Sequence, residues 1–377
     1  CGEGTHVYFR IRKIGLTTMQ AVGQIAKALG RAARDIGYAG LKDASAVTTQ
    51  MLSIEHIDPA RVEALQVPRI EVLSVSRHRN KLKLGHLAGN RFTIRVRETD
   101  VARVGDVRGM LELLTRRGVP NYFGPQRFGI RGDTWAIGRA LVRGDDAEAV
   151  LLMLGRAGPH DYGEVRKARE LFDHGEYEKA ANTWPYPFHN EKRICWAIAK
   201  SGGNLARAMR QVDPQMKRFY VSAYQSQLFN QVVAERLESI DRLLEGDLAW
   251  RHPQGAVFRV EDVAREQPRC DAFEISPTGP LFGYRMTEPT GAPAELESRV
   301  LSAEGMGPAD WRDGTRLKVK GARRPLRFRP HDAQVEAGRD EHGDFIEVRF
   351  QLESGCYATT VLREICKSDL TAVGGED

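Results

Sequence analysis

The chain has 377 residues, of which 41% are hydrophobic and 28% are charged, and its formal net charge is +6. This length is too great for one minimal domain and suits two domains, or one domain with a large insertion. The balance of apolar and charged residues is typical of a folded globular protein and excludes an intrinsically disordered one. No apolar run approaches the length of a membrane span, and no secretory signal is visible, so we expect a cytoplasmic protein.

The five cysteines are scattered along the chain without any CxxC pair. An odd number in a chain of this length indicates buried thiols in a reducing compartment rather than a disulfide framework. Because the first residue is Cys1 and not Met, we expect the sequence to begin inside a longer gene product.

The amino-terminal residues predict a strand followed by a helix. Residues 7–12 alternate apolar and polar side chains, which is the period of a half-buried strand. Thr17 or Thr18 can cap the helix that follows, and Gly30 ends it.

More strands are expected after this helix. A short loop over residues 37–43 leads into a strand near residues 47–54. Two further strand-like segments, residues 75–84 and 91–97, are joined by a glycine-containing stretch over residues 85–90. The glycines suit a tight reversal, so we predict a hairpin or a closely related strand pair.

The middle of the chain has a different texture. After a predicted helix over residues 107–117, irregular and helical segments alternate for nearly two hundred residues. Among them, Ser222 begins a capping-box pattern that predicts a helix running to about Glu238. Strand-like patterns return at residues 316–320 and 345–352, and a last helix is expected after Tyr357. This order predicts an α+β domain interrupted by an insertion.

Basic residues gather in two segments that contain no acidic residue, residues 77–97 and 316–329. The predicted nucleic-acid-binding side chains in them are Arg77, Arg79, Lys81, Lys83, Arg91, Arg95, Arg97, Arg323 and Arg324. In the predicted strands of the first segment the basic side chains share one face, while Leu82, Phe92 and Ile94 point into a core. Two such segments imply a polyanionic partner, because phosphates offset the repulsion between like charges. The alternatives are a solvated sheet face and pairing with acidic residues elsewhere in the fold.

Several common catalytic motifs are missing from the sequence: a P-loop, a GxGxxG after a strand, HExxH, zinc-ligand spacing and a nucleophile elbow. Nucleotide-driven, redox and metal-hydrolytic reactions are therefore disfavoured. An enzyme with this sequence is expected to work without cofactor or metal, with side chains and its substrate alone.

Residues 40–50 contain the candidate catalytic group. Asp43 stands on a tight loop just ahead of a strand, where a carboxylate is exposed and firmly placed, although many such Asp residues only cap or solvate a turn. The stretch resembles the signature of the TruD family of pseudouridine synthases, a G-x-K-D loop followed by A-x-T-x-Q. The matching residues are Gly40, Lys42, Asp43, Ala46, Thr48 and Gln50. Four more stretches are similar to the family, in its order: residues 77–92, 118–129, 224–230 and 352–364.

The resemblance implies a fold and an activity. The expected fold is an α+β pseudouridine-synthase core with a mixed, largely antiparallel sheet, built from residues 1–117 and 313–377, with the family's insertion domain over residues 118–312. Members isomerise uridine to pseudouridine in structured RNA, chiefly tRNA at uridine 13, without a cofactor. The expected partner is therefore tRNA or another structured RNA, with no membrane and no obligatory protein partner.

The resemblance also implies residue roles. Asp43 would act on the ribose, either by attacking C1′ or by removing a C2′ proton to give a glycal. Phe92 would stack on the target base, or else pack in the core beside Ile94 and Val96. Asn90 would position the loop around the nucleotide, or else only form a turn. The family's amino-terminal lysine, thought to pair with the catalytic aspartate, has no counterpart in this sequence.

Two other functions compete with this interpretation. A non-catalytic RNA-binding protein would use the same basic residues. An RNA enzyme of another class, such as a methyltransferase, would need a nucleotide-type cofactor site, and the sequence shows none.

Overall fold

The computed structural model describes residues 2–311 and 318–367, and the chain divides into two compact units, residues 1–90 and 91–377. This division differs from the expected one, whose boundaries at residues 118 and 312 stay predictions. Among the described residues, no helix is both long enough and apolar enough to cross a bilayer.

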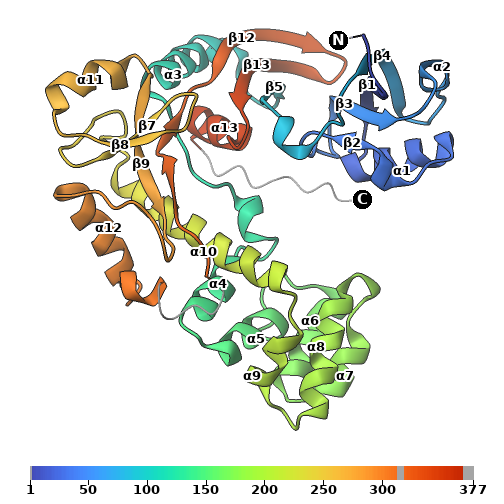
Figure 1. Ribbon diagram of the computed structural model, residues 1–377, viewed down its shortest axis with the longest axis vertical. Coiled ribbons are helices and arrows are strands. Elements are labelled where there is room, and N and C mark those ends of the chain that lie inside the picture. Colours follow the sequence, from blue (N-terminus) through green and yellow to red (C-terminus); the bar gives the residue numbers. More distant parts are fainter. Residues whose placement is uncertain (1, 312–317, 368–377) are drawn as a thin grey trace. The chain divides into compact units, whose positions relative to one another are not determined.

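The first unit is a four-stranded sheet with a helix packed on one face (Figure 1). Its strands, in pairing order, are β2 (Gly37–Tyr38), β3 (Val47–Glu55), β1 (His6–Ile14) and β4 (Ile70–His78), and its helices are α1 (Thr18–Leu29) and α2 (Pro59–Glu63). β1 is antiparallel to both β3 and β4. Its alternate residues Val7, Phe9 and Ile11 are buried in one core with Val22 and Ile25 of α1. The predicted amino-terminal strand is therefore confirmed.

The ends of α1 follow the local sequence signals. The Thr17 side chain accepts a hydrogen bond from the Gln20 N–H (3.1 Å), and the Gln20 side chain accepts one from the Thr17 N–H (2.8 Å). This reciprocal pair is a capping box. Gly30 closes the helix in the left-handed conformation, with φ of 66°. The predicted helix is confirmed, as is the strand near residues 47–54.

The predicted hairpin over residues 75–97 is wrong. β4 ends at His78, before the glycines, and pairs with β1, whereas β5 (Gly89–Val96) belongs to a different sheet. Residues 79–83 are not in a strand, so the basic side chains among them do not share a strand face. The glycines suggested a reversal, but β5 finds its partner in a strand far along the chain, which no local pattern can report.

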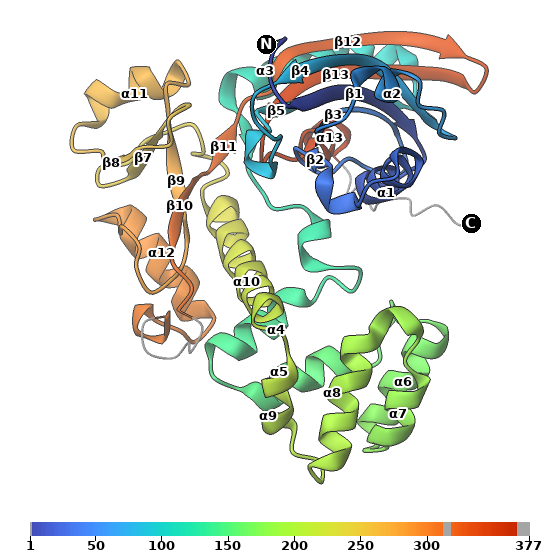
Figure 2. The same cartoon turned by 45° about the vertical axis from the view of Figure 1, so that its right-hand side comes forward.

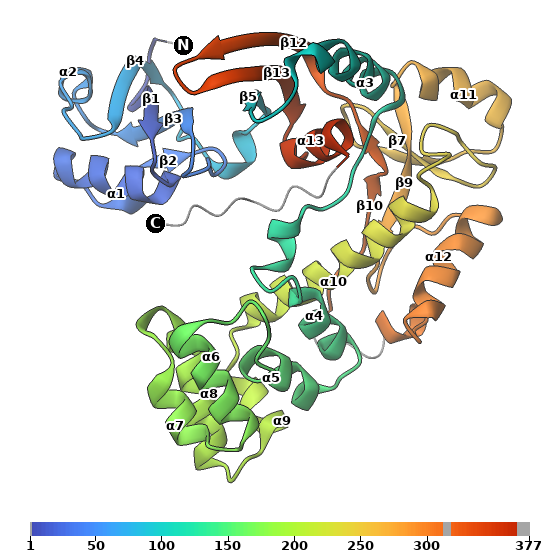
Figure 3. The same ribbon diagram turned by 180° about the vertical axis from the view of Figure 1, so that it is seen from behind.

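The second unit contains that other sheet, flanked by two helices (Figure 3). Its strands are β12 (His331–Asp340), β13 (Gly343–Glu353) and β5, and the helices are α3 (Val104–Arg117) and α13 (Ala358–Cys366). Leu111 of α3, Val348 of β13 and Val361 of α13 share one buried core. These elements confirm the helix predicted at residues 107–117, the strand at residues 345–352 and the carboxyl-terminal helix.

A four-stranded sheet and two further helices follow in the same unit. They are β10 (Ala322–Pro325), β9 (Ile275–Leu281), β7 (Leu248–Arg251) and β8 (Val257–Arg259), with α11 (Val263–Asp271) and α12 (Ala292–Ala303); β6 (Val119–Pro120) pairs separately with β11 (Arg327–Phe328). β9 pairs with both β7 and β10 in the antiparallel direction. The strand predicted at residues 316–320 falls partly outside the described residues, and the strand after it is β10. Helices and antiparallel sheets together confirm the expected α+β class.

The long helix α10 (Pro214–Glu235) runs from this sheet to a group of helices (Figure 2). These are α4 (Thr134–Val142), α5 (Asp146–Leu154), α6 (Gly163–Asp173), α7 (Tyr177–Thr183), α8 (His189–Lys200) and α9 (Leu205–Ala208). The predicted start of α10 at Ser222 is wrong. Asp213 caps the helix by accepting from the Gln215 N–H (2.6 Å), and Pro214 stands at its first position, where proline is favoured.

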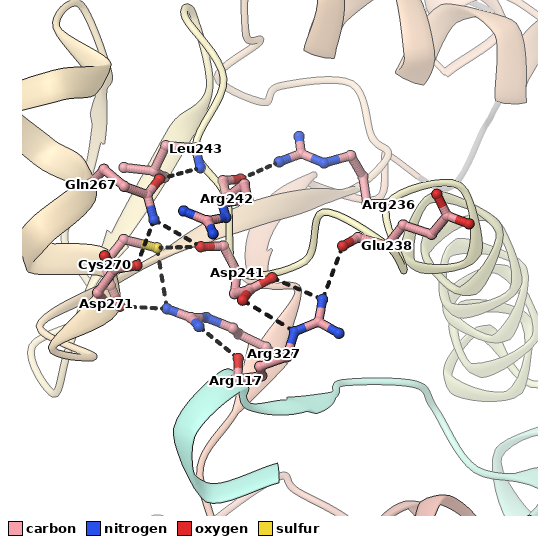
Figure 4. Close-up of polar contacts among 10 residues, drawn as sticks. All are labelled: Arg117, Arg236, Glu238, Asp241, Arg242, Leu243, Gln267, Cys270, Asp271 and Arg327. Atoms are coloured by element: carbon pink, nitrogen blue, oxygen red, sulfur yellow. Dashed lines mark hydrogen bonds and ion pairs between the residues drawn. The ribbon is translucent and has the colours of Figure 1, made fainter. Parts of the chain in front are cut away.

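Buried Arg327 directly follows the segment of residues 118–326 and contacts Arg117, which directly precedes it (Figure 4). Arg327 donates to the carbonyl oxygens of Arg117 and Cys270, both at 2.6 Å. Arg117 in turn pairs with Asp241 at 2.9 Å. Burial lowers the pKa of Arg327. These contacts hold the two ends of the segment close to each other.

Candidate active site

Asp43 lies in the first unit, on the loop between β2 and β3, and is exposed to solvent. Within residues 2–90 and the rest of the described chain, its carboxylate accepts no hydrogen bond and forms no ion pair; only its backbone carbonyl is bonded. The loop is held by its backbone, so the carboxylate can reach a substrate from a fixed position.

A buried lysine holds this loop. Lys13, near the end of β1, has an exposed fraction of 0%. Its ammonium donates to the carbonyl oxygens of Leu16, Lys42 (3.5 Å) and Asp43 (2.9 Å). Burial lowers the pKa of Lys13, an effect that Asp43 opposes and Lys42 reinforces. A buried ammonium requires such oxygens, and here they join the loop that carries Asp43 to the segment before α1.

Lys13 was not among the site residues predicted from the sequence. A signal was present, because Val7, Phe9 and Ile11 set the buried face of β1 and residue 13 is the next position on that face. A lysine at a core position is rare unless its charge is satisfied, so it marks a site.

Signature residues fix the loop at other points. The Thr18 hydroxyl accepts from the Lys42 N–H (2.8 Å) and donates to the Gln50 side chain (2.9 Å). Gly40 has φ of 71°, and a Cβ there would lie 2.6 Å from Leu87 Cδ2. The left-handed conformation therefore favours glycine, and a larger residue would also have to displace the Leu87 side chain.

Asn90 lies beside the same loop. The Lys42 ammonium donates to the Asn90 side-chain oxygen, and burial lowers the pKa of Lys42 while Asp43 raises it. The first unit thus brings together Asp43, Lys42 and Asn90. The part that Asn90 plays toward a nucleotide stays a prediction.

Phe92 belongs to the second unit and is partly buried on β5. Its ring centroid lies 5.6 Å from that of Phe350, and it packs with Ile94 against the core of the three-stranded sheet. The Phe92 side chain therefore has the contacts expected if it packs in the core. Its stacking role stays a prediction.

The predicted RNA-binding residues of the first unit differ in what they contact. Arg77, Arg79 and Lys83 are exposed. Arg79 forms a surface ion pair with Glu3 (3.3 Å), which contributes little to stability. Lys81 is partly buried, and its ammonium donates to the Arg34 carbonyl (2.9 Å).

Those of the second unit are mostly paired with acidic residues. Arg95 contacts Asp340 (2.9 Å) and Glu347 (2.8 Å), and Arg97 contacts Asp340 (2.6 Å). Arg91 is exposed. For Arg95 and Arg97, the alternative that basic residues pair with acidic residues elsewhere in the fold is therefore the one observed.

Arg323 and Arg324 are neighbours in β10 with opposite surroundings. Arg323 is buried and forms an ion pair with Glu297 at 2.6 Å. As placed, it has no surface to offer to RNA. Arg324 is partly buried and contacts the ring of Phe123, with its guanidinium carbon 4.3 Å from the centroid.

Across the described ranges, no group of three or more His, Cys, Asp or Glu side chains is arranged to hold a metal ion. The four described cysteines are free thiols.

The chain is similar to known proteins over nearly its whole length. The sequence profile of a family described as tRNA pseudouridine synthase D (TruD) matches residues 1–365. The tRNA pseudouridine synthase D of Geobacter sulfurreducens is 44% identical over 97% of this chain and 89% of its own length. That of Geobacter metallireducens is 46% identical, over 97% and 90%. A solved structure assigned to TruD, from Methanosarcina mazei, has a TM-score of 0.84 and 28% identity, covering 97% of this chain and 89% of its own.

Proposed function

This chain belongs to the tRNA pseudouridine synthase D (TruD) family, and from that premise we propose that it converts uridine 13 of tRNA to pseudouridine with Asp43 as catalytic carboxylate. The observation that carries the proposal is the exposed Asp43 side chain on a loop that a buried ammonium fixes. A reacting group that is accessible and already in position lowers the cost of reaching the transition state.

The proposed reaction breaks the bond between N1 of the base and C1′ of the ribose. The freed base turns and its C5 joins C1′, which releases Asp43 from C1′ or is followed by return of the proton to C2′. The proton on C5 passes to water, and N1 takes up a proton from water, so that the product is an isomer of uridine. Asp43 either attacks C1′ to form a covalent intermediate or removes a proton from C2′. Both routes need a carboxylate that an extruded nucleotide can reach.

The remaining residues are assigned by their surroundings. Asn90, held by the Lys42 ammonium, positions the loop at the nucleotide. For Phe92, whose contacts are those of a core residue, stacking on the base rests on the family resemblance alone. The exposed residues Arg77, Arg79, Lys83 and Arg91 contact phosphates, together with Arg324. Lys81, Arg95 and Arg97 contribute only by exchanging their present partners for RNA. Arg323 is left out of the RNA-binding set because it is buried with Glu297. A cytoplasmic location follows from the proposed substrate.

The test uses tRNA labelled with tritium at C5 of uridine, because forming the new bond at C5 releases that label to water. Wild-type protein should release it. Asp43→Asn should lower the rate by at least about 1,000-fold, as expected for a group that takes part in the chemistry. Asp35→Asn is the matched control in the same unit, since it keeps the oxygen that accepts from the Ala32 N–H (3.2 Å).

The outcomes separate the competing functions. A purely RNA-binding protein would release no tritium, and its Asp43→Asn variant would bind tRNA as wild type does. Release that persists in the Asp43→Asn variant would remove the proposed role of this residue. A labelled tRNA transcript with cytidine in place of uridine 13 tests the site. If position 13 is the target, this transcript should release no tritium, although its other uridines are labelled.

A further inference from the structure

Three of the family-like stretches meet in the second unit at the ring of Phe123. The Phe123 N–H donates to the Asn230 side chain (2.8 Å), and the Asn230 amide donates back to the Phe123 carbonyl (3.0 Å). The ring contacts Phe229 of α10 at 5.6 Å and Tyr357, just before α13, at 6.5 Å between centroids. Backbone and ring are therefore both fixed.

Two arginines lie over this ring. The guanidinium carbon of Arg324 is 4.3 Å from the ring centroid and that of Arg127 is 6.0 Å from it. Their hydrogen bonds are to Asn121 (2.6 Å) and the Gly355 carbonyl (3.1 Å) for Arg324, and to Ser222 and Ser226 (3.2 Å) for Arg127. All four acceptors are neutral. The contacts orient both guanidinium groups and leave both charges uncompensated.

Neither Arg127 nor Arg324 pairs with a carboxylate in the described part of the chain, and both are partly buried. Burial lowers the pKa of each, and Arg127 lowers that of Arg324 further. A guanidinium nevertheless stays charged in proteins. Two positive charges therefore lie within 6.0 Å of the centroid of one ring, partly removed from water, and an anion is needed to compensate them.

Other buried arginines of this unit have what these two lack. Arg323 has the carboxylate of Glu297. Arg327 has no ion pair, but each of its three guanidinium nitrogens donates to a protein atom. By contrast, the described residues offer no acceptor to Nη1 of Arg127 or Arg324, and the buried Nε of Arg324 has no partner. The Nη1 group of each arginine therefore remains as a donor for a ligand, whereas the Nε of Arg324 is too deeply buried to reach one.

We propose that Arg127 and Arg324, above the ring of Phe123, form a binding site for one phosphodiester of the RNA backbone. This inference rests on the proposed function, which supplies the RNA. A phosphodiester has two free oxygens, and a guanidinium fork matches such oxygens in geometry and charge. A phosphate contact fixes the position of the RNA without reading its sequence. The site therefore holds the tRNA body, and its loss affects binding rather than the chemical step.

The experiment measures the affinity of the full chain for a tRNA transcript between about 50 and 200 mM salt, where the slope of log K against log salt counts the phosphates contacted. Arg127→Gln and Arg324→Gln should each reduce the magnitude of the slope by about 0.7 to 0.9. Each should raise KM for tritium release roughly tenfold, the loss expected for one charge-assisted contact, with kcat unchanged. Arg324→Lys keeps the charge and should keep the slope.

Arg139→Gln is the matched control. Arg139 also lies over an aromatic ring, 5.1 Å from the centroid of Trp135, but it pairs with Glu304 at 3.2 Å. Its loss should leave the slope as in wild type. If Arg324→Gln does not fold, Arg127→Gln carries the test, because the side-chain partners of Arg127 are two neutral hydroxyl groups of one helix, those of Ser222 and Ser226.

Each outcome decides between the two proposals. Unchanged slopes and KM in both Gln variants, with a wild type that releases tritium, overturn the phosphate site and leave the proposed function standing. A wild type that binds tRNA without releasing tritium overturns the function, and the slopes still judge the site. If inorganic phosphate raises the Tm of wild type but not of the variants while tRNA slopes stay equal, the site takes free phosphate and the RNA assignment is wrong.

Discussion

Among single residues, the exposed Asp43 depends on the buried Lys13. The Lys13 ammonium contacts three carbonyl oxygens, two of which belong to the loop that carries Asp43. The third, of Leu16, belongs to the segment that leads into α1. Moving the loop would leave a buried charge without its oxygens, so one side chain in the core restricts the position of another at the surface.

Replacing Lys13 with Met tests this dependence. The methionine chain fills similar space but donates nothing, so the three carbonyls lose their partner. We expect the free energy of unfolding to fall by about 1 to 3 kcal/mol, the range for a hydrogen bond to a charged group. We expect kcat for tritium release to fall at least roughly tenfold with little change in KM, because a displaced carboxylate affects the chemical step more than RNA binding.

The control is Lys27→Met in the last turn of α1, where the lysine is exposed. It should leave both stability and kcat near the wild-type values. A folded Lys13→Met protein with wild-type kcat would show that the loop keeps its position without the ammonium.

Arg323 and Arg324 show where reading single residues from the sequence fails. Both stand in one basic segment, and both were predicted to bind RNA. Successive residues of β10 face opposite ways, so Arg323 points to Glu297 and Arg324 to Phe123. The basic segment was visible in the sequence, but the buried acid lies on another element and only the fold brings it near.

At the scale of elements, local signals succeeded where the cause is local. Thr17 and Gly30 define α1 because capping acts within a few residues. The start of α10 was missed because Ser222 matched a capping pattern, while the aspartate–proline pair at 213–214 is the stronger start. The partner of β5 could not be predicted, because strand pairing between distant segments leaves no pattern in either one alone.

The basic residues of the segment 77–97 should therefore respond differently to substitution, according to whether an acidic residue already pairs with them. Arg79→Gln and Lys83→Gln should each lower the magnitude of the tRNA salt slope by roughly 0.7 to 0.9, because both side chains are exposed and can meet phosphates. Arg97→Gln should change the slope much less, because Asp340 already compensates that charge at 2.6 Å. The measurement is tRNA affinity against salt, with Tm as a check on folding.

The Tm values of the Arg97→Gln and Arg79→Gln variants supply a control. Arg97→Gln should lower the Tm, since it leaves Asp340 with fewer donors, whereas Arg79→Gln removes only a surface ion pair and should not. If Arg97→Gln lowers the slope as much as Arg79→Gln does, then Arg97 exchanges Asp340 for a phosphate when RNA binds.

For the whole molecule, the family resemblance predicted more than the local patterns did. Local patterns already predicted the α+β class, but the resemblance added the family and five family-like stretches in order, and the family match covers residues 1–365. It did not predict that the chain divides at residue 90, between Asn90 and its near neighbour Phe92. That division depends on the pairing of β5 with the sheet of the second unit, which is again a contact between distant segments.

The second unit also contains the thiols expected from the cysteine pattern. Cys195 and Cys270 are buried, and burial raises their pKa to about 11. The pKa of Cys356 is raised to about 12 for the same reason. A pKa above the unfolded value of 9.0 means that the folded state holds its proton more tightly. The resulting stabilisation is complete below pH 9 and is lost as the pH rises through 11.

We therefore expect the free energy of unfolding of the second unit to fall between pH 9 and 11, with Cys195 contributing up to about 3 kcal/mol of the change. Urea unfolding at several pH values measures it, and Cys195→Ala should weaken the dependence on pH. Cys366 is partly exposed and supplies the control, because Cys366→Ala should alter the dependence less.

The thiol of Cys366 should also react with a thiol reagent before those of Cys195 and Cys270, which need unfolding first. Equal rates for all thiols at pH 8 would mean that the cores around Cys195 and Cys270 open far more readily than their burial implies.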